Sequence, residues 1–129
     1  MRVLLDTDTV LWMVSDDPKL SPAARQAIVA ADEVFWSVLS LWETAIKLGL
    51  GRPDFRLGEG WARLIPEELT RNRVGRLEIE GRHCEELTRL PWHHRDPFDR
   101  MLAAQARAEQ LDVVSRDGSF EAYGIRRIW

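Results

Sequence analysis

Four acidic side chains stand next to the apolar segments of this sequence, where they could share a metal ion. Asp6 directly follows the first apolar run, and Asp117 comes just after the fourth. Glu43 and Asp99 fall within the first two turns of two expected helices. Two unit charges about 4 Å apart repel by about 4 kcal/mol at an effective dielectric constant of roughly 20, so four converging carboxylates need a compensating cation. Oxygen ligands without cysteine suit Mg²⁺ or Mn²⁺, and such a metal beside open water can cleave phosphodiester bonds.

The elements that would position these acids form an alternating pattern. Short apolar runs rich in β-branched residues are separated by segments with helical spacing, which is typical of a parallel sheet covered by helices. The expected strands are Val3–Leu5, Val34–Trp36, Val74–Ile79, Val113–Val114 and Ile125–Ile128. In an open parallel sheet, ligands bind beyond the carboxyl ends of the strands, at the point where the strand order reverses. Asp6 and Asp117 are expected at that edge, and Glu43 and Asp99 can approach it from neighbouring helices.

Capping signals predict three helices. Ser21-Pro22 and Asp96-Pro97 each combine an N-cap residue with proline at the first helical position, which indicates helices over 22–31 and 97–110. Ser37 is expected to cap a further helix that the next glycine stops. The residues expected to point inward from these last two helices are Val38, Leu41, Trp42, Ala45 and Ile46 on the earlier one, and Phe98, Met101, Leu102 and Ala106 on the later one.

Two less regular helices are expected in the middle of the chain. They cover residues 61–70 and 81–90, and Pro66 is a candidate break in the first. The turn-rich stretch over 49–60 is expected to be a connection inside one domain.

Each of the four acids also has an ordinary structural explanation. Asp6 and Asp117 can cap helices, and Asp117 can also open an Asx turn. Asp99 suits the positive end of a helix dipole, and Glu43 can form an ion pair with Lys47 one turn later. Independent caps and surface pairs have no reason to fall at the same end of one sheet, and this coincidence favours a shared site.

The composition is that of an ordinary globular domain. The chain has 129 residues, 45% hydrophobic and 30% charged, with a formal net charge of -3, and we expect one domain over 1–129. Its single cysteine, Cys84, excludes an internal disulfide and a four-cysteine zinc module. No apolar stretch approaches about 18 residues, so we expect a cytoplasmic protein without membrane insertion. The net charge argues against holding nucleic acid by bulk electrostatics, but it does not exclude a nucleic-acid enzyme.

Three other groups of residues are expected to have ordinary structural roles. The segment 92–96, Trp-His-His-Arg-Asp, could bind a metal or stack on bases, but adjacent histidines do not easily chelate one ion and we expect a solvated loop. Arg71, Arg73 and Arg76 could steer a phosphate backbone, yet two glutamates follow at once and indicate a solvated face. The tryptophans are mostly expected in the core, with one or two left for a protein interface.

Four sequence blocks, in order along the chain, carry a resemblance to a known family. They are Leu4-Leu5-Asp6-Thr7; Ser37 with Ser40-Leu41-Trp42-Glu43 and Ile46-Lys47; Asp96-Pro97-Phe98-Asp99-Arg100 with the following Met101–Ala106; and Ser115-Arg116-Asp117 with Tyr123-Gly124-Ile125. Together they resemble the PIN-domain ribonucleases of the VapC toxin type. The third block is the most specific of the four.

This resemblance implies a fold, an activity and partners. The fold would be a three-layer α/β/α sandwich around a five-stranded parallel sheet. The activity would be that of a Mg²⁺-dependent endoribonuclease acting as the toxin of a toxin-antitoxin pair. Such toxins act on RNA, are inhibited by a cognate antitoxin that inserts into the active-site groove, and usually form homodimers.

The resemblance also assigns site residues. The acids that match the family's catalytic and metal-binding positions are Asp6, Glu43, Asp99 and Asp117. Thr7 and Ser115 match its small hydroxyl residues, and Asp96 ranks below Asp99 as a site acid. Asp8 is a departure, because this subgroup commonly has histidine or asparagine there, and the added charge could alter metal affinity or substrate contacts.

Two rival readings remain open. Asp6-Thr7-Asp8-Thr9-Val10 after an apolar strand also fits haloacid-dehalogenase-like phosphatases, with Asp6 as the covalent nucleophile and Asp8 as the acid/base. That chemistry needs a distant lysine, for which Lys19 and Lys47 are expected to be badly placed, and the chain is short for that fold. The other rival is an inactive scaffold that binds RNA or protein, against which the intact set of acids argues.

Overall fold

Five short parallel strands form the centre of the fold. The computed structural model describes residues 1–51, 57–93 and 95–129. The strands are β1 (Arg2–Leu5), β2 (Glu33–Ser37), β3 (Gly75–Leu77), β4 (Asp112–Val114) and β5 (Arg127–Ile128). They lie in the order β3-β2-β1-β4-β5, and every neighbouring pair is parallel. All five expected strands are present, although β3 and β5 are shorter than the apolar runs that predicted them.

Alternating side chains of these strands enter two separate cores. Leu4 is paired with Phe35 on one side and with Val113 on the other, and these three side chains enter one core. Their neighbours in sequence, including Leu5 and Val114, enter the core on the opposite face. A strand buried on both faces reads as a continuous apolar run, which is why the sequence pattern found these strands.

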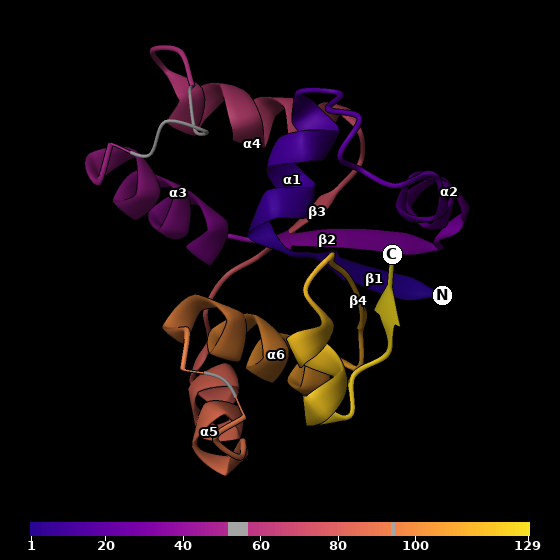
Figure 1. Cartoon of the computed structure of the whole chain (residues 1–129), viewed down its shortest axis with the longest axis vertical. Helices are drawn as coiled ribbons and strands as arrows, with labels where there is room; N and C mark the ends of the chain where they lie inside the picture. The colour runs from indigo at the N-terminus through magenta and orange to yellow at the C-terminus, as the bar shows by residue number, and fades with distance from the viewer. Residues whose placement is uncertain (52–56, 94) are drawn as a thin grey trace.

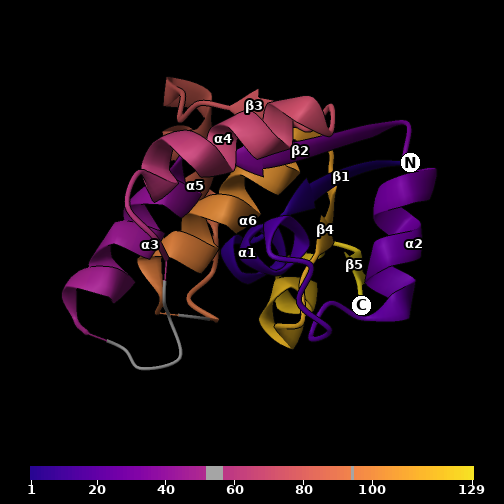
Figure 2. The same cartoon turned by 90° about the horizontal axis from the view of Figure 1, so that it is seen from above.

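Helices cover both faces of the sheet (Figures 1 and 2). On one face lie α1 (Thr7–Val14), α2 (Pro22–Ala30) and α4 (Trp61–Arg71). On the other lie α5 (Gly81–Arg89), α6 (Pro97–Glu109) and the short 3-10 helix η1 (Gly118–Tyr123). Helix α3 (Leu39–Gly49) follows the carboxyl end of β2 and contributes Leu39 to one core and Leu41 to the other. This arrangement confirms the expected α/β/α sandwich with a five-stranded parallel sheet.

Three details of the helices differ from the sequence expectations. The span of α1 behind Asp6 was not predicted, although a cap at Asp6 implied a helix there, because a run rich in threonine and valine gives a weak helical signal. Ser37 ends β2 and Val38 stands at the cap position of α3, although the Ser37 hydroxyl accepts from the N–H of Leu39 at 3.3 Å. Pro66 does not break α4, which continues through it. The caps formed by Ser21 and Asp96 are confirmed.

The expected inward face of α3 is wrong for three of its five residues. Trp42 and Ile46 are 59% and 45% exposed and Ala45 is exposed, whereas Val38 and Leu41 are half-buried. The buried residues of this helix are Leu39, Ser40, Glu43 and Thr44. The helix is turned so that its polar face points toward α1 rather than toward solvent. The ring of Trp42 instead meets Phe98 of α6 edge-on, with 4.8 Å between the ring centroids. On α6 the expectation holds for Leu102 and Ala106, which are buried, and Phe98 and Met101 pack against the same core half-buried.

The weaker sequence groups have the expected ordinary environments. Arg71 and Arg76 form ion pairs with Glu68 and Glu78 on the surface. Trp92 and His93 are exposed, as a solvated loop requires, while His94 and residues 52–56 of the expected connection lie outside the described residues. The exposed tryptophans are Trp42 and Trp92, whereas Trp36 is fully buried and Trp12, Trp61 and Trp129 are half-buried. Within 1–51, 57–93 and 95–129, no helix has both the length and the apolar character needed to cross a membrane.

Helix α1 is tied to β4 beside the carboxyl edge of the sheet. The hydroxyl of Thr9 donates to the carbonyl of Val114 at 2.9 Å, and both groups are buried. The same carbonyl accepts a longer bond of 3.3 Å from the backbone N–H of Asp6. The side chain of Asp6 in turn caps α1 by accepting from the N–H of Thr9. These bonds fix the direction in which the chain leaves β1.

Replacing Thr9 by valine should weaken this tie. Thr9→Val keeps the shape of the side chain but removes the donor, and we expect a loss of about 1 kcal/mol in the free energy of unfolding, the usual net value of such a bond. Urea denaturation measures this loss. Thr88→Val is the matched control, because the hydroxyl of Thr88 donates to a backbone carbonyl at an exposed position and its loss should have almost no effect. Equal losses in both variants would contradict the assignment.

Candidate active site

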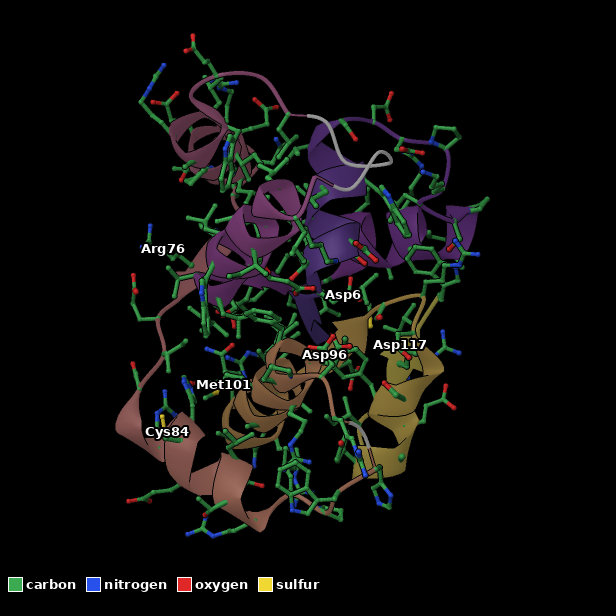
Figure 3. All side chains as sticks on the ribbon, turned by 60° about the vertical axis from the view of Figure 1, so that its left-hand side comes forward. Asp6, Arg76, Cys84, Asp96, Met101 and Asp117 are labelled. Atoms are coloured by element: carbon green, nitrogen blue, oxygen red, sulfur yellow. The ribbon has the colours of Figure 1, made fainter. Side chains whose placement is uncertain are left out.

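A small acidic pocket lies at the carboxyl edge of the sheet. From β1 the chain continues to β2 on one side and returns later as β4 on the other, so the strand order reverses between β1 and β4. A pocket of about 200 Å³ lies at this edge, where an open parallel sheet is expected to bind its ligand. Figure 3 shows Asp6, Asp96 and Asp117 converging on it from different segments of the chain. The residues that line it are Asp6, Thr7, Asp8, Glu43, Lys47, Asp96, Asp99 and Asp117.

Asp6 is held in the pocket by two donors. One carboxylate oxygen accepts from the backbone N–H of Thr9 at 2.9 Å, which is the N-cap bond of α1, and the other accepts from the hydroxyl of Ser115. Burial raises the pKa of Asp6 to about 6, the hydrogen bonds from Ser115 and Thr9 oppose this shift, and the nearby Asp8 charge adds to it. Asp6 therefore caps α1 and also lines the shared pocket.

Asp117 is linked to Asp6 through a single hydroxyl. Its backbone N–H donates to the Ser115 hydroxyl oxygen at 2.9 Å, while the Ser115 hydroxyl hydrogen goes to Asp6. One oxygen of Asp117 accepts from the N–H of Ser119 and so caps η1. The predicted capping roles of Asp6 and Asp117 are thus confirmed. The same caps turn both carboxylates toward one pocket.

Glu43 is buried, and both of its oxygens have partners. The hydroxyl of Thr7 donates to Oε1 at 2.5 Å, and Nζ of Lys47 lies 3.0 Å from Oε2. Because the Thr7 hydroxyl has a single hydrogen, the hydroxyl of Ser40, 2.9 Å away, donates to Thr7 in turn. The predicted pair between Glu43 and Lys47 is confirmed, but it lines the pocket and is not an ordinary surface bridge.

Asp99 lies in the electrostatic field of the other acids of the pocket. It stands in the first turn of α6, which Asp96 caps by accepting from the N–H groups of Phe98 at 2.8 Å and Asp99 at 3.3 Å. Burial raises the pKa of Asp99 to about 8, and further contributions come from the charges of Asp96, Glu43, Asp117 and Asp6. The four acids named from the sequence therefore lie in one electrostatic environment, together with Asp96.

The donor set of this pocket fits a hard divalent cation. All of its acidic ligands are carboxylates, and no cysteine or histidine lines it among the described residues. Burial and, after it, the neighbouring negative charges raise the pKa of Asp99, so its ionised form is disfavoured in the metal-free pocket. A cation such as Mg²⁺ would relieve that repulsion, and oxygen ligands are those it prefers.

The sequence paired Lys47 with Glu43 but did not place Lys47 in the pocket, and it did not link Asp8 to Lys47. The ammonium of Lys47 lies 3.0 Å from Glu43 and 3.6 Å from Asp8, and all three line the pocket. Lys47 was expected to be badly placed as the distant lysine of the phosphatase rival, yet it lines the same pocket as Asp6. The spacing of four residues gave its pairing with Glu43, and the rotation of α3 brings that pair into the pocket.

A second group of acids and a histidine joins α5 to α6. Glu80, His83 and Glu109 offer ligand atoms within 4.8 Å of one another. His83 is buried, and its Nδ1 accepts from the backbone N–H of Glu80 while its Nε2 lies 2.8 Å from Glu109. Both ring nitrogens thus have partners within the chain, and the group connects the start of α5 to the end of α6.

The raised pKa values of Asp6 and Asp99 predict that the metal-free protein loses stability as the pH rises. In the unfolded chain both groups titrate near 3.8, but in the folded chain near 6 and near 8. The folded state therefore binds more protons over this range, and the free energy of unfolding falls between about pH 4 and pH 8.

Asp99→Asn should remove the larger part of this pH-dependent loss in the free energy of unfolding. We expect a flatter pH dependence and a gain on the order of 1–3 kcal/mol at pH 8, measured by urea denaturation in EDTA at pH 5 and pH 8. Asp16→Asn is the control, because Asp16 is exposed and pairs with Arg25 away from the pocket. A wild-type slope in Asp99→Asn would show that the carboxyl of Asp99 is not the group responsible.

Comparisons with known proteins agree with the observed fold. The model of the PIN domain family matches residues 3–125. Similar solved structures include VapBC-1 from nontypeable Haemophilus influenzae, with 18% identity and a TM-score of 0.68 over 98% of this chain and 96% of that one. VapBC2 from Rickettsia felis, bound to a DNA fragment from its promoter, has 13% identity and a TM-score of 0.66 over 98% and 97%.

FitAcB from Neisseria gonorrhoeae is a third similar structure, with 20% identity and a TM-score of 0.60 over 97% of this chain and 95% of that one. No curated protein sequence matches the chain. At these identities the solved structures share the fold, and the family model covers nearly the whole sequence. The chain therefore belongs to the PIN domain family.

Proposed function

We propose that this protein is a metal-dependent endoribonuclease and the toxin of a toxin-antitoxin pair. The observation that carries the proposal is the convergence of Asp6, Glu43, Asp99 and Asp117 in one pocket of a PIN domain. These four residues would hold Mg²⁺, or Mn²⁺, and the substrate would be RNA. Because its substrate and its antitoxin would both be met in the cytoplasm, we place the protein there.

Each acid of the pocket would have a role in binding the cation. Asp6, Asp99 and Asp117 would bind the cation, with Glu43 bound directly or through water. The bound metal would lower the pKa of a water molecule and stabilise charge on the scissile phosphate. Ser115 and the N–H of Thr9 hold the carboxylate of Asp6 in place, and Asp99 must lose its proton to act as a ligand. No side chain would form a covalent bond with the substrate.

The partners follow from the similar structures and from the surface. A toxin-antitoxin complex from Klebsiella pneumoniae has a similar fold, with a TM-score of 0.59, and the structure of VapBC2 holds a DNA fragment from its promoter. We propose a cognate antitoxin for this chain, encoded by a neighbouring gene. The inhibitor would cover the acidic pocket, where it would exclude RNA.

The phosphatase rival requires a different role for the same carboxylate. Asp6 would then be a nucleophile, and the position of Lys47 beside Asp8 removes one objection to that chemistry. Membership of the PIN domain family nevertheless favours hydrolysis by water, and it equally favours an enzyme over an inactive scaffold. A phospho-aspartate trapped at Asp6 would support the rival.

Asp6→Asn and Asp99→Asn should abolish RNA cleavage without unfolding the protein. Each change removes a negative ligand while keeping the size of the side chain, so we expect a loss of at least a hundredfold, to the level seen in EDTA. Cleavage of a mixed RNA substrate with and without Mg²⁺ measures the effect, and Asp16→Asn should cleave like wild type. Activity retained in both site variants would reject the assignment.

The same variants test the toxin role in cells. Expression of the wild-type chain alone should arrest bacterial growth, Asp99→Asn should be harmless, and co-expression of the neighbouring small reading frame should restore growth. If the chain cleaves RNA in vitro but its expression does not slow growth, the nuclease activity would stand and the toxin role would be rejected.

We also propose that two copies of the chain associate through α3. Trp42 and Ile46 of α3 and Leu50, its C-cap residue, are spaced by four residues and are 59%, 45% and 68% exposed, so one face of α3 and its end present apolar side chains to solvent. Contiguous exposed apolar side chains mark protein contacts in soluble proteins. This supports the homodimer that the resemblance implies.

A charge on this face should separate the two copies. We expect the wild-type chain to sediment at twice its mass of 14.9 kDa, and Ile46→Glu with Leu50→Glu to sediment as a monomer with unchanged circular dichroism. Val29→Glu is the matched control, because Val29 is 87% exposed on α2 and should tolerate the change. A wild-type monomer, or a double variant that stays dimeric, would contradict the proposal.

A further inference from the structure

We propose that Lys47 takes the place of a second metal ion on the Glu43 side of the pocket, so that each chain binds a single divalent cation. This inference rests on the proposed function, because it concerns the metal stoichiometry of the same site. It assigns a role to Lys47 and to the unusual Asp8, neither of which the proposed metal ligands explain.

The first observation is the position of the ammonium group. Nζ of Lys47 lies 3.0 Å from Oε2 of Glu43 and 3.6 Å from Oδ1 of Asp8. The Lys47 side chain is only 27% exposed, and among the described residues that line the pocket it is the one with a positive charge. A positive charge bracketed by two carboxylates occupies the kind of position that a metal ion would take.

The second observation is that Glu43 already has a donor on each oxygen. Thr7 donates to Oε1 and Lys47 pairs with Oε2. A metal ion bound directly between Glu43 and Asp8 would have to displace Lys47, and its double positive charge would be repelled by an ammonium held one helical turn away on α3.

The third observation is how the pocket divides. Asp6, Asp96, Asp99 and Asp117 line the rest of the pocket, whereas the ammonium of Lys47 lies 3.0 Å from Glu43 and 3.6 Å from Asp8. The side of the pocket that Glu43 and Asp8 form therefore already contains a cation that belongs to the chain.

Asp8 strengthens this arrangement. Its carboxylate lies 3.6 Å from the ammonium of Lys47. Its negative charge helps to hold that ammonium beside Glu43. A neutral side chain at position 8 would leave Lys47 with one carboxylate partner fewer. The acid at this position thus acts as a positioning residue for Lys47.

Counting bound Mn²⁺ tests the proposal without measuring activity. Isothermal titration calorimetry of the full chain should give one Mn²⁺ per wild-type chain and two per Lys47→Met chain, because the Glu43–Asp8 side then lacks its own cation. Lys47→Arg keeps the charge and should still bind one. Lys19→Met is the matched control, since Lys19 is the other lysine of the chain and is exposed beside Asp17.

A crystal soaked in Mn²⁺ provides a second measurement that needs no variant. Anomalous scattering should show one peak beside Asp6, Asp99 and Asp117, with Lys47 still in contact with Glu43. A second peak between Glu43 and Asp8, two ions per wild-type chain in calorimetry, or one ion per folded Lys47→Met chain would each overturn the inference.

These outcomes separate the inference from the function on which it rests. A wild-type chain that binds two Mn²⁺ ions and cleaves RNA would overturn the role of Lys47 alone. A chain that binds no Mn²⁺ would overturn both.

Discussion

The repulsion among carboxylates that are buried or half-buried in one pocket is the constraint on which the rest of this structure depends. Six acids line a pocket of about 200 Å³ at the carboxyl edge of the sheet. Left to themselves, such side chains would turn to water. They are instead held by specific donors: the Ser115 hydroxyl and the N–H of Thr9 hold Asp6, and the Thr7 hydroxyl holds Glu43. Ordinary capping and hydroxyl contacts thus keep negative charge concentrated in one place, as the proposed binding of a cation would require.

Much of the fold could be predicted because its strands are buried on both faces and read as short apolar runs. The helices that were predicted well, such as those behind Ser21 and Asp96, begin with a cap and a proline. Helix α1 was missed because its threonines and valines favour strands as readily as helices. The face of α3 was predicted wrongly because apolar periodicity assumes that the apolar side is buried. Here the buried side includes Ser40 and Glu43, which the pocket requires.

The candidate site could be predicted in part, since topology alone brings the residues after β1 and β4 to one edge. Position along the elements was sufficient to name Asp6, Glu43, Asp99 and Asp117, and the pocket contains all four. Position was not sufficient for Lys47, whose role depends on the rotation of α3, nor for the Ser115 bridge, which depends on atomic contacts between segments far apart in sequence. A sequence pattern shows where chain segments meet, but the partner of each hydrogen bond is decided by side-chain packing.

The edge-on contact between Trp42 and Phe98 has a mechanical consequence. Each ring immediately precedes an acid of the pocket, Glu43 on α3 and Asp99 on α6, so the rings act as a spacer between the two helices that carry these acids. Trp42 is also part of the exposed apolar face of α3. A molecule that binds this face of α3 would therefore contact a ring that separates Glu43 from Asp99, so that binding on the outer surface would be coupled to the spacing of two acids of the pocket.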